Sequence, residues 1–128
     1  MAEIEQKIIF HATPSEVYEL LMDSRRHSAF TGDKASISRE VGGKIKAYGD
    51  YIEGINMELI DSKRIVQRWR ASDWPKGQYS VIRIELIRKG RETELHFKQT
   101  NLPEGQKEEI AEGWYEYYWD KMKKYFGE

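Results

Sequence analysis

Histidine is the residue whose chemistry would be most informative in this chain, because imidazole binds metal ions and exchanges protons near neutral pH. The chain has three histidines, His11, His27 and His96, and no cysteine. Metal-binding histidines typically recur three or four residues apart on one element or belong to motifs such as HExxH, and these three do not. We therefore predict no metal site and no thiol or disulfide chemistry, and we interpret His11 and His96 as strand residues.

Other catalytic motifs are also missing from the sequence. It contains no GxSxG motif, and the Gly42-Gly43 pair lacks the following helix and the Lys-Ser/Thr of a phosphate-binding loop. We expect no cofactor and no enzymatic activity. A cyclase-like enzyme is the last of three functional alternatives, because it needs an acid–base residue that the sequence does not single out.

Composition excludes further classes of function. The 128 residues include 21 Lys and Arg against 22 Asp and Glu, a net charge of -1, so no basic field favours nucleic acid or a membrane surface. No apolar run approaches the roughly 20 residues that span a bilayer. The start, MAEIEQKIIFHA, has charge where a signal peptide is apolar. We expect one domain over residues 1–128 in the cytoplasm.

The N-terminal part predicts a strand followed by two helices. Residues 3–11 alternate as a strand. Thr13, Pro14 and Glu16 then mark a helix start, with a Thr-x-x-Glu capping box and proline in the first turn. A second short helix should run through Arg26 to Phe30 and end at Thr31-Gly32.

From residue 34 to 101 the apolar period changes to two. Ile65, Gln67 and Trp69 share one strand face, while Arg68 and Arg70 share the other. The alternation predicts antiparallel strands in a sheet with one buried face and one solvent-exposed face. The next two strands put on the apolar side Ile82, Ile84, Leu86, Leu95, Phe97 and Gln99. The predicted strands lie near 35–40, 44–50, 51–60, 64–71, 78–89 and 92–100.

The last segment, from about Glu108 to Phe126, predicts a long aromatic helix. Seven of the chain's 16 aromatic residues lie within positions 113–127. The apolar face of the predicted sheet needs a long element to cover it, and this helix is the only long amphipathic segment in the sequence. We predict an α+β helix-grip fold, in which a curved antiparallel sheet wraps a C-terminal helix. The helical spacing assigns to the apolar side Ala111, Trp114, Tyr115, Tyr118, Trp119, Met122, Tyr125 and Phe126.

Three stretches carry a family resemblance: VGGKIKAYGDYIEGINMELIDSKRIVQRWRASDWPKGQYSVIRIEL, TELHFKQTNLPEG and EGWYEYYWDKMKKYFG. In this order they resemble the C-terminal domain of activators of heat-shock protein 90 ATPase, a family of the START-related helix-grip superfamily. The resemblance implies a stress-response co-chaperone that binds the chaperone and stimulates its ATPase. Two-domain members add an N-terminal domain for which this chain has no room. The wider superfamily implies a small apolar ligand between sheet and helix.

The side chains that face this predicted interior are candidates for such a ligand pocket. Gln67 and Gln99 lie at strand positions whose side chains face the predicted apolar side of the sheet. Buried amides there need hydrogen-bond partners. They either bond a tyrosine hydroxyl of the last helix, such as that of Tyr118, or orient a ligand, and the two alternatives are compatible. We interpret the aromatic candidates first as core residues, an interpretation that leaves room for a cavity between helix and sheet. The full candidate set is Gln67, Trp69, Ile82, Ile84, Phe97, Gln99, Trp114 and Tyr118.

The charged face offers a candidate partner surface. Nine basic residues lie between Lys63 and Arg91, against two acidic ones. They either form cross-strand ion pairs with glutamates of neighbouring strands or dock an acidic protein surface. Trp74, in the SDWPKG loop, either folds over the pocket mouth or serves as an exposed anchor for a partner. The candidate surface residues are Arg68, Arg70, Trp74 and Arg83.

Overall fold

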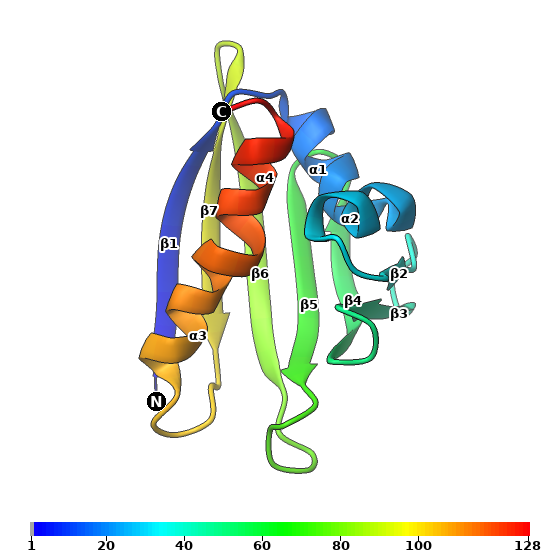
Figure 1. The fold of residues 1–128 in the computed structure, drawn as a ribbon, viewed down its shortest axis with the longest axis vertical. Helices are drawn as coiled ribbons and strands as arrows, with labels where there is room; N and C mark the ends of the chain where they lie inside the picture. Colours follow the sequence, from blue (N-terminus) through cyan, green and yellow to red (C-terminus); the bar gives the residue numbers. More distant parts are fainter. Residues whose placement is uncertain (1) are drawn as a thin grey trace.

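A single antiparallel sheet curves around the C-terminal helix, as predicted, in the computed structural model, which describes residues 2–128. Figure 1 shows this helix running along one face of the sheet, with the two N-terminal helices on the same side. The α+β helix-grip prediction is confirmed. The elements are β1 (Glu3–Phe10), α1 (Pro14–Met22), α2 (Ser24–Thr31), β2 (Ser36–Ile37), β3 (Lys44–Ala47), β4 (Ile52–Ile60), β5 (Arg64–Ala71), β6 (Ser80–Lys89), β7 (Glu92–Thr100), α3 (Lys107–Trp114), η1 (Tyr115–Trp119) and α4 (Asp120–Tyr125).

The strand order is β1-β7-β6-β5-β4-β3-β2, so the first strand pairs with the last. The register of β1 against β7 runs from Glu3 opposite Thr100 to Phe10 opposite Thr93. The remaining pairs are between strands adjacent in sequence, which short turns allow. The edges of the sheet are therefore β1 and the two-residue strand β2.

Local sequence signals fix the two N-terminal helices. The Thr13 hydroxyl accepts a bond from the Glu16 amide, and the Glu16 carboxylate accepts one from the Thr13 amide, so the capping box is complete. The carboxylate of Asp23 caps α2 by accepting from the Arg26 amide at 3.0 Å. Gly32 ends α2 in the left-handed region, with φ of 77°, which glycine adopts at little cost.

Strand alternation places the predicted apolar side of β5, β6 and β7 in the core. Ile82, Ile84, Leu95 and Phe97 are all buried there. In β4 the alternation holds as far as Met57, which is 46% exposed while Asn56 is buried, and a register shift between Asn56 and Glu58 then interrupts it. Within residues 2–128, none of the helices is long and apolar enough to cross a membrane.

The C-terminal helix contains a five-residue π turn, η1, between α3 and α4. The amide of Asp120 bonds the carbonyl of Tyr115, five residues earlier. In an α-helix, side chains five residues apart point about 140° apart, but the wider turn brings them onto one side. Trp114 and Trp119 consequently stack, with ring centroids 5.4 Å apart and planes at 19°.

The π turn also corrects the predicted apolar side of this helix. Trp114, Tyr118 and Trp119 occupy the face that packs on the sheet. Tyr115 and Tyr125, which the regular helical spacing assigned to that side, are 42% and 49% exposed. The prediction for these two tyrosines was wrong, because the helical spacing is not regular through η1.

Candidate functional site

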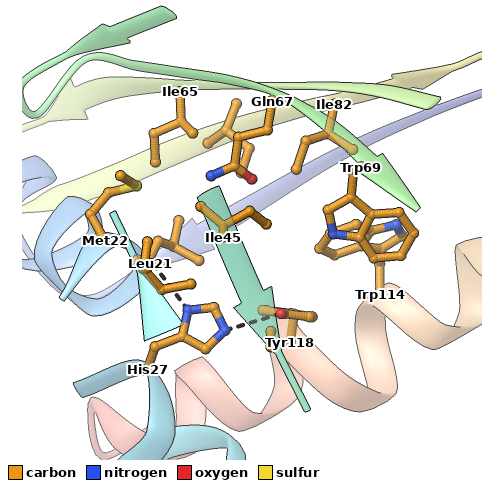
Figure 2. Close-up of a pocket in the computed structure, with 13 residues that line it drawn as sticks. Leu21, Met22, His27, Ile45, Ile65, Gln67, Trp69, Ile82, Trp114 and Tyr118 are labelled. Atoms are coloured by element: carbon orange, nitrogen blue, oxygen red, sulfur yellow. Dashed lines mark hydrogen bonds between the residues drawn. The ribbon is translucent and has the colours of Figure 1, made fainter. Parts of the chain in front are cut away.

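A small apolar cavity lies between the sheet and the C-terminal helix. Figure 2 shows its lining, with side chains from β5 and β6 on one side and from the helices on the other. Its volume of about 30 Å³ is enough for roughly one water molecule. The sheet therefore wraps the C-terminal helix as predicted, but side chains nearly fill the space between them. Six of the eight predicted pocket residues line it: Gln67, Trp69, Ile82, Ile84, Trp114 and Tyr118.

The other two predicted pocket residues, Phe97 and Gln99, lie outside this lining and hold the helix against the sheet. Gln99 accepts a bond from the indole Nε1 of Trp114 at 2.8 Å and donates to the Ser80 hydroxyl at 2.9 Å. The Phe97 ring packs on Trp114 and Trp119, at centroid distances of 4.5 and 5.3 Å. Both buried residues contact the helix directly.

The alternative in which the two glutamines bond a tyrosine hydroxyl was wrong. Gln67 donates instead to the Oδ1 of Asn56 on the neighbouring strand, at 3.0 Å. The Nδ2 of Asn56 donates in turn to the carbonyls of Ser38 and Glu40. This chain of bonds satisfies the buried amides and ties the loop after β2 to the sheet.

Tyr118 bonds His27, which was not among the predicted site residues. The hydroxyl lies 3.0 Å from Nε2 of His27, and Nδ1 of His27 lies 3.0 Å from the carbonyl of Leu21 (Figure 2). Because a carbonyl only accepts, Nδ1 carries the proton and donates to Leu21. The neutral ring then accepts the Tyr118 proton at Nε2.

Burial keeps this pair uncharged. It lowers the pKa of His27, an effect that the bond to the Leu21 carbonyl partly opposes. Burial also raises the pKa of the Tyr118 hydroxyl far above its ordinary value. Both ring nitrogens of His27 are engaged, so neither is free to accept a proton from a reactant. The pair positions α2 against the C-terminal helix.

A larger groove adjoins the cavity at the end of the sheet where β5 finishes. Its volume is about 480 Å³, and it shares Trp69, Trp114 and Tyr118 with the cavity. Tyr48 and Tyr51, on either side of the β3–β4 turn, were not predicted as site residues. We call this the aromatic groove; its aromatic lining is Tyr48, Tyr51, Trp69, Trp74, Trp114, Tyr117 and Tyr118.

Trp74 lines the aromatic groove and is only 5% exposed. Its ring packs edge-on against Trp69, with centroids 5.5 Å apart. The alternative in which Trp74 is an exposed anchor for a partner was therefore wrong. The other alternative, in which it folds over the pocket mouth, agrees with its position.

Tyr48 joins the β3–β4 turn to the π turn. It has a positive φ of 52°, an uncommon conformation for a bulky residue. Its hydroxyl donates to the Tyr117 carbonyl, and its ring lies 5.7 Å from that of Tyr117 and 5.9 Å from that of Tyr118. Burial raises the pKa of this hydroxyl well above its usual range. The strained turn thus forms one wall of the aromatic groove.

The predicted partner-surface arginines differ in their surroundings. Arg68 is exposed and stacks on the Tyr79 ring at 4.4 Å, and Arg83 lies 51% exposed near Glu85. The side chain of Arg70 is only 14% exposed. It pairs with Glu53 at 3.4 Å and donates to the carbonyl of Trp74 at 2.9 Å. Arg70 therefore holds the loop after β5.

Ion pairs engage some of the nine basic residues between Lys63 and Arg91. Glu85 on β6 lies 3.9 Å from Arg64 on β5 and 3.8 Å from Arg83 on its own strand, and Lys89 on β6 lies 3.7 Å from Glu94 on β7. Such exposed pairs contribute little to stability, because water screens them and ordering long side chains costs entropy. Both alternatives for this face remain compatible with the geometry.

The sequence matches known proteins over nearly its whole length. The family model described as "Activator of Hsp90 ATPase homolog 1-like protein" matches residues 11–127. The chain is 31% identical, over 125 residues, to the human "Activator of 90 kDa heat shock protein ATPase homolog 1". It is 32% identical, over 118 residues, to the Dictyostelium discoideum homolog of that activator. These matches cover 98% and 91% of the chain but only 37% and 31% of the two relatives.

Solved structures share the fold. An HSP90 activator from Plasmodium falciparum superposes with a TM-score of 0.93 at 23% identity, covering 99% of this chain and 97% of that one. The Aha1 dimer from Colwellia psychrerythraea has a TM-score of 0.78 at 20% identity, with coverages of 91% and 90%. The match to the family model over residues 11–127 identifies the chain as a member of the activator of Hsp90 ATPase homolog 1-like family.

Proposed function

We propose that this domain is a non-enzymatic co-chaperone module that binds a 90 kDa heat-shock chaperone and stimulates its ATPase. The observation that supports the proposal most is the family match over residues 11–127, together with 31% identity to the human activator. The nearly filled interior is consistent with it, because a cavity of about 30 Å³ leaves the outer surface as the place for a function. The satisfied nitrogens of His27 also offer no obvious catalytic base.

The test is the ATPase rate of the chaperone from the same organism as this protein is titrated in, with a specific ATPase inhibitor to define background. We expect a saturable rise in rate, and binding of the same affinity in calorimetry. Binding without a rise would limit the proposal to a binding module. Absence of both binding and stimulation would contradict it.

The exposed arginines of the sheet are the contact surface that we propose for the chaperone. Arg68 and Arg83 project from neighbouring strands on the outer face. Reversing both charges (R68E and R83E) should weaken chaperone binding and reduce its dependence on salt, with little change in melting temperature. A matched control reverses Arg91, an exposed residue at the β6–β7 turn. Equal affinities of the wild type and the double variant for the chaperone would show that this surface does not contact it.

Binding of a small hydrophobic ligand is a second candidate function. It is favoured by the apolar lining of the cavity and by the three aromatic residues that the cavity shares with the groove. Because the cavity as it stands holds about one water, the helix would have to move away from the sheet to admit a ligand. Native mass spectrometry of the freshly purified protein should then show extra mass that is lost on denaturation. A ligand-free spectrum from several expression hosts would argue against it.

A further inference from the structure

The aromatic groove carries charge of only one sign. Among the described residues that line it, the charged ones are Asp33, Asp73 and Glu109, and all three are exposed acids. They come from three separate segments: the loop after α2, the loop after β5 and the first turn of α3. The fold thus brings three carboxylates to one opening from positions far apart in the sequence.

The carboxylates act on the groove itself. The Tyr51 hydroxyl donates to Asp73 at 3.2 Å. Burial raises the pKa of Tyr51, and the nearby charge of Asp73 and then that of Glu109 raise it further. Burial likewise raises the pKa of Tyr48, and Asp33 contributes to the same direction. The negative charges are therefore felt by the side chains that form the groove wall.

The walls of the groove are aromatic and partly open to solvent. Trp69, Trp74 and Trp114 form the deeper part, where each is no more than 7% exposed. Tyr51 and Tyr117, at the rim, are 46% and 49% exposed. Aromatic faces carry partial negative charge, so they attract cations and reinforce the neighbouring carboxylates.

We propose that the aromatic groove binds a small organic cation, an alkylated ammonium or a guanidinium compound. The volume of about 480 Å³ falls within the roughly 300–1,000 Å³ of small-molecule sites. The aromatic walls favour the alkyl groups of such a cation, and the carboxylates favour its charge. A bare metal ion would use the carboxylates but not the aromatic walls. This proposal goes beyond chaperone binding and does not depend on it.

Choline and its neutral carbon isostere, in which a quaternary carbon replaces the nitrogen, provide a matched pair of probes. Binding is followed by NMR through the indole N–H signals of the four tryptophans. We expect choline to give saturable shifts of Trp69, Trp74 and Trp114, which line the groove. Trp119, whose indole donates to Gln6 away from the groove, should stay unchanged. The isostere should bind more weakly by roughly threefold or more, because it lacks the charge.

Charge-removing variants of similar shape test the carboxylates. The double variant of Asp73→Asn and Glu109→Gln should weaken choline binding by roughly threefold or more, while its denaturation curve remains that of the wild type. Glu108→Gln is the matched control, because Glu108 lies in the same exposed first turn of α3 but does not line the groove. Its choline affinity should equal that of the wild type.

Several results would overturn the proposal. Equal binding of choline and its isostere would mean that the groove selects only for apolar surface. An equal loss in the Glu108→Gln control would show a general charge effect. Binding of a capped lysine- or arginine-containing pentapeptide without binding of choline would assign the groove to a protein partner instead. Since all of these measurements omit the chaperone, their failure would leave the co-chaperone proposal standing.

Discussion

The buried His27–Tyr118 pair is the residue-level feature with the clearest consequence for stability. His27 is neutral in the folded protein, and burial lowers its pKa, whereas the unfolded chain binds a proton near the ordinary pKa of about 6.5. Below that pH the unfolded state binds more protons, so the folded state loses stability as the pH falls. The contribution of neutral His27 to the free energy of unfolding is present above about pH 6.5 and is lost on acidification.

We expect the free energy of unfolding, measured in urea, to fall between about pH 7 and pH 5, by up to about 1.4 kcal/mol per pH unit from this group. A His27→Gln variant, although less stable at neutral pH, should lose less over the same interval because it lacks the titrating ring. The same loss in both proteins would show that His27 does not control the acid response.

Arg70 should behave differently from its neighbour Arg68. Replacing Arg70 by alanine removes the ion pair with Glu53 and the bond to the Trp74 carbonyl, and should cost about 1–3 kcal/mol of stability. Replacing Arg68 by alanine removes only an exposed stack on Tyr79 and should cost less than about 1 kcal/mol. Tryptophan fluorescence during urea unfolding measures both. Equal stabilities would contradict a structural role for Arg70.

The hydrogen-bond partners of the side chains were less predictable from the sequence than the sheet face on which each side chain lies. Strand alternation placed Gln67 and Gln99 on the buried side, and both are buried. It did not reveal that Asn56 lies opposite Gln67 in the register of β4 and β5 and is the residue that bonds it. His27 was missed because α2 is a short, mostly polar helix; the available signal was its spacing of three residues from Phe30, whose ring lies 5.1 Å away.

At the scale of the elements, Gln6 links the edge strand β1 to the C-terminal helix. Its Nε2 donates to the carbonyl of Ala111 at 2.9 Å, and its Oε1 accepts from the indole of Trp119 at 2.7 Å. The amide of Tyr115 bonds the carbonyl of Glu112 at the start of the π turn. Gln6 thus bonds the helix on both sides of the point where its regular spacing changes.

A Gln6→Leu variant should lower the free energy of unfolding by about 1–3 kcal/mol, because the fully buried Trp119 indole would lose its acceptor. Chemical denaturation measures the loss, and hydrogen exchange should show faster opening of the C-terminal helix. Substituting the exposed neighbour Glu5 by alanine provides the control. If both variants were equally stable, the link would not be important for holding the helix.

The π turn marks the limit of prediction from periodicity. The aromatic-rich segment correctly predicted a long helix covering the dry face of the sheet. A period of 3.6 residues puts Trp114 and Trp119 about 140° apart, at the two borders of a wide apolar side, and it cannot stack their rings, which needs the wider turn. Tyr115 and Tyr125 were assigned to the wrong side because the prediction assumed regular spacing. No residue type in this segment signals where the helix widens.

Across the whole molecule, stability should decrease from the centre of the sheet towards the β2 edge. Strands β5, β6 and β7 are paired on both sides, while β2 has two residues and one partner. We expect the slowest amide hydrogen exchange in β6 and β7 and the fastest among strands in β2 and β3. Measurement by NMR under native conditions would test this order. Slow exchange in β2 would mean that the edge is covered by something else.

The pairing of β1 with β7 has a consequence for synthesis on the ribosome. Residues 3–10 are synthesised well before the strand that they pair with, which ends at residue 100, and the helix that Gln6 bonds follows later still. Until then Ile4, Ile8 and Phe10 have no sheet to bury them. While residues 11–100 are being synthesised, the nascent chain therefore presents an apolar, strand-forming segment without its partner strand, which favours association with other molecules.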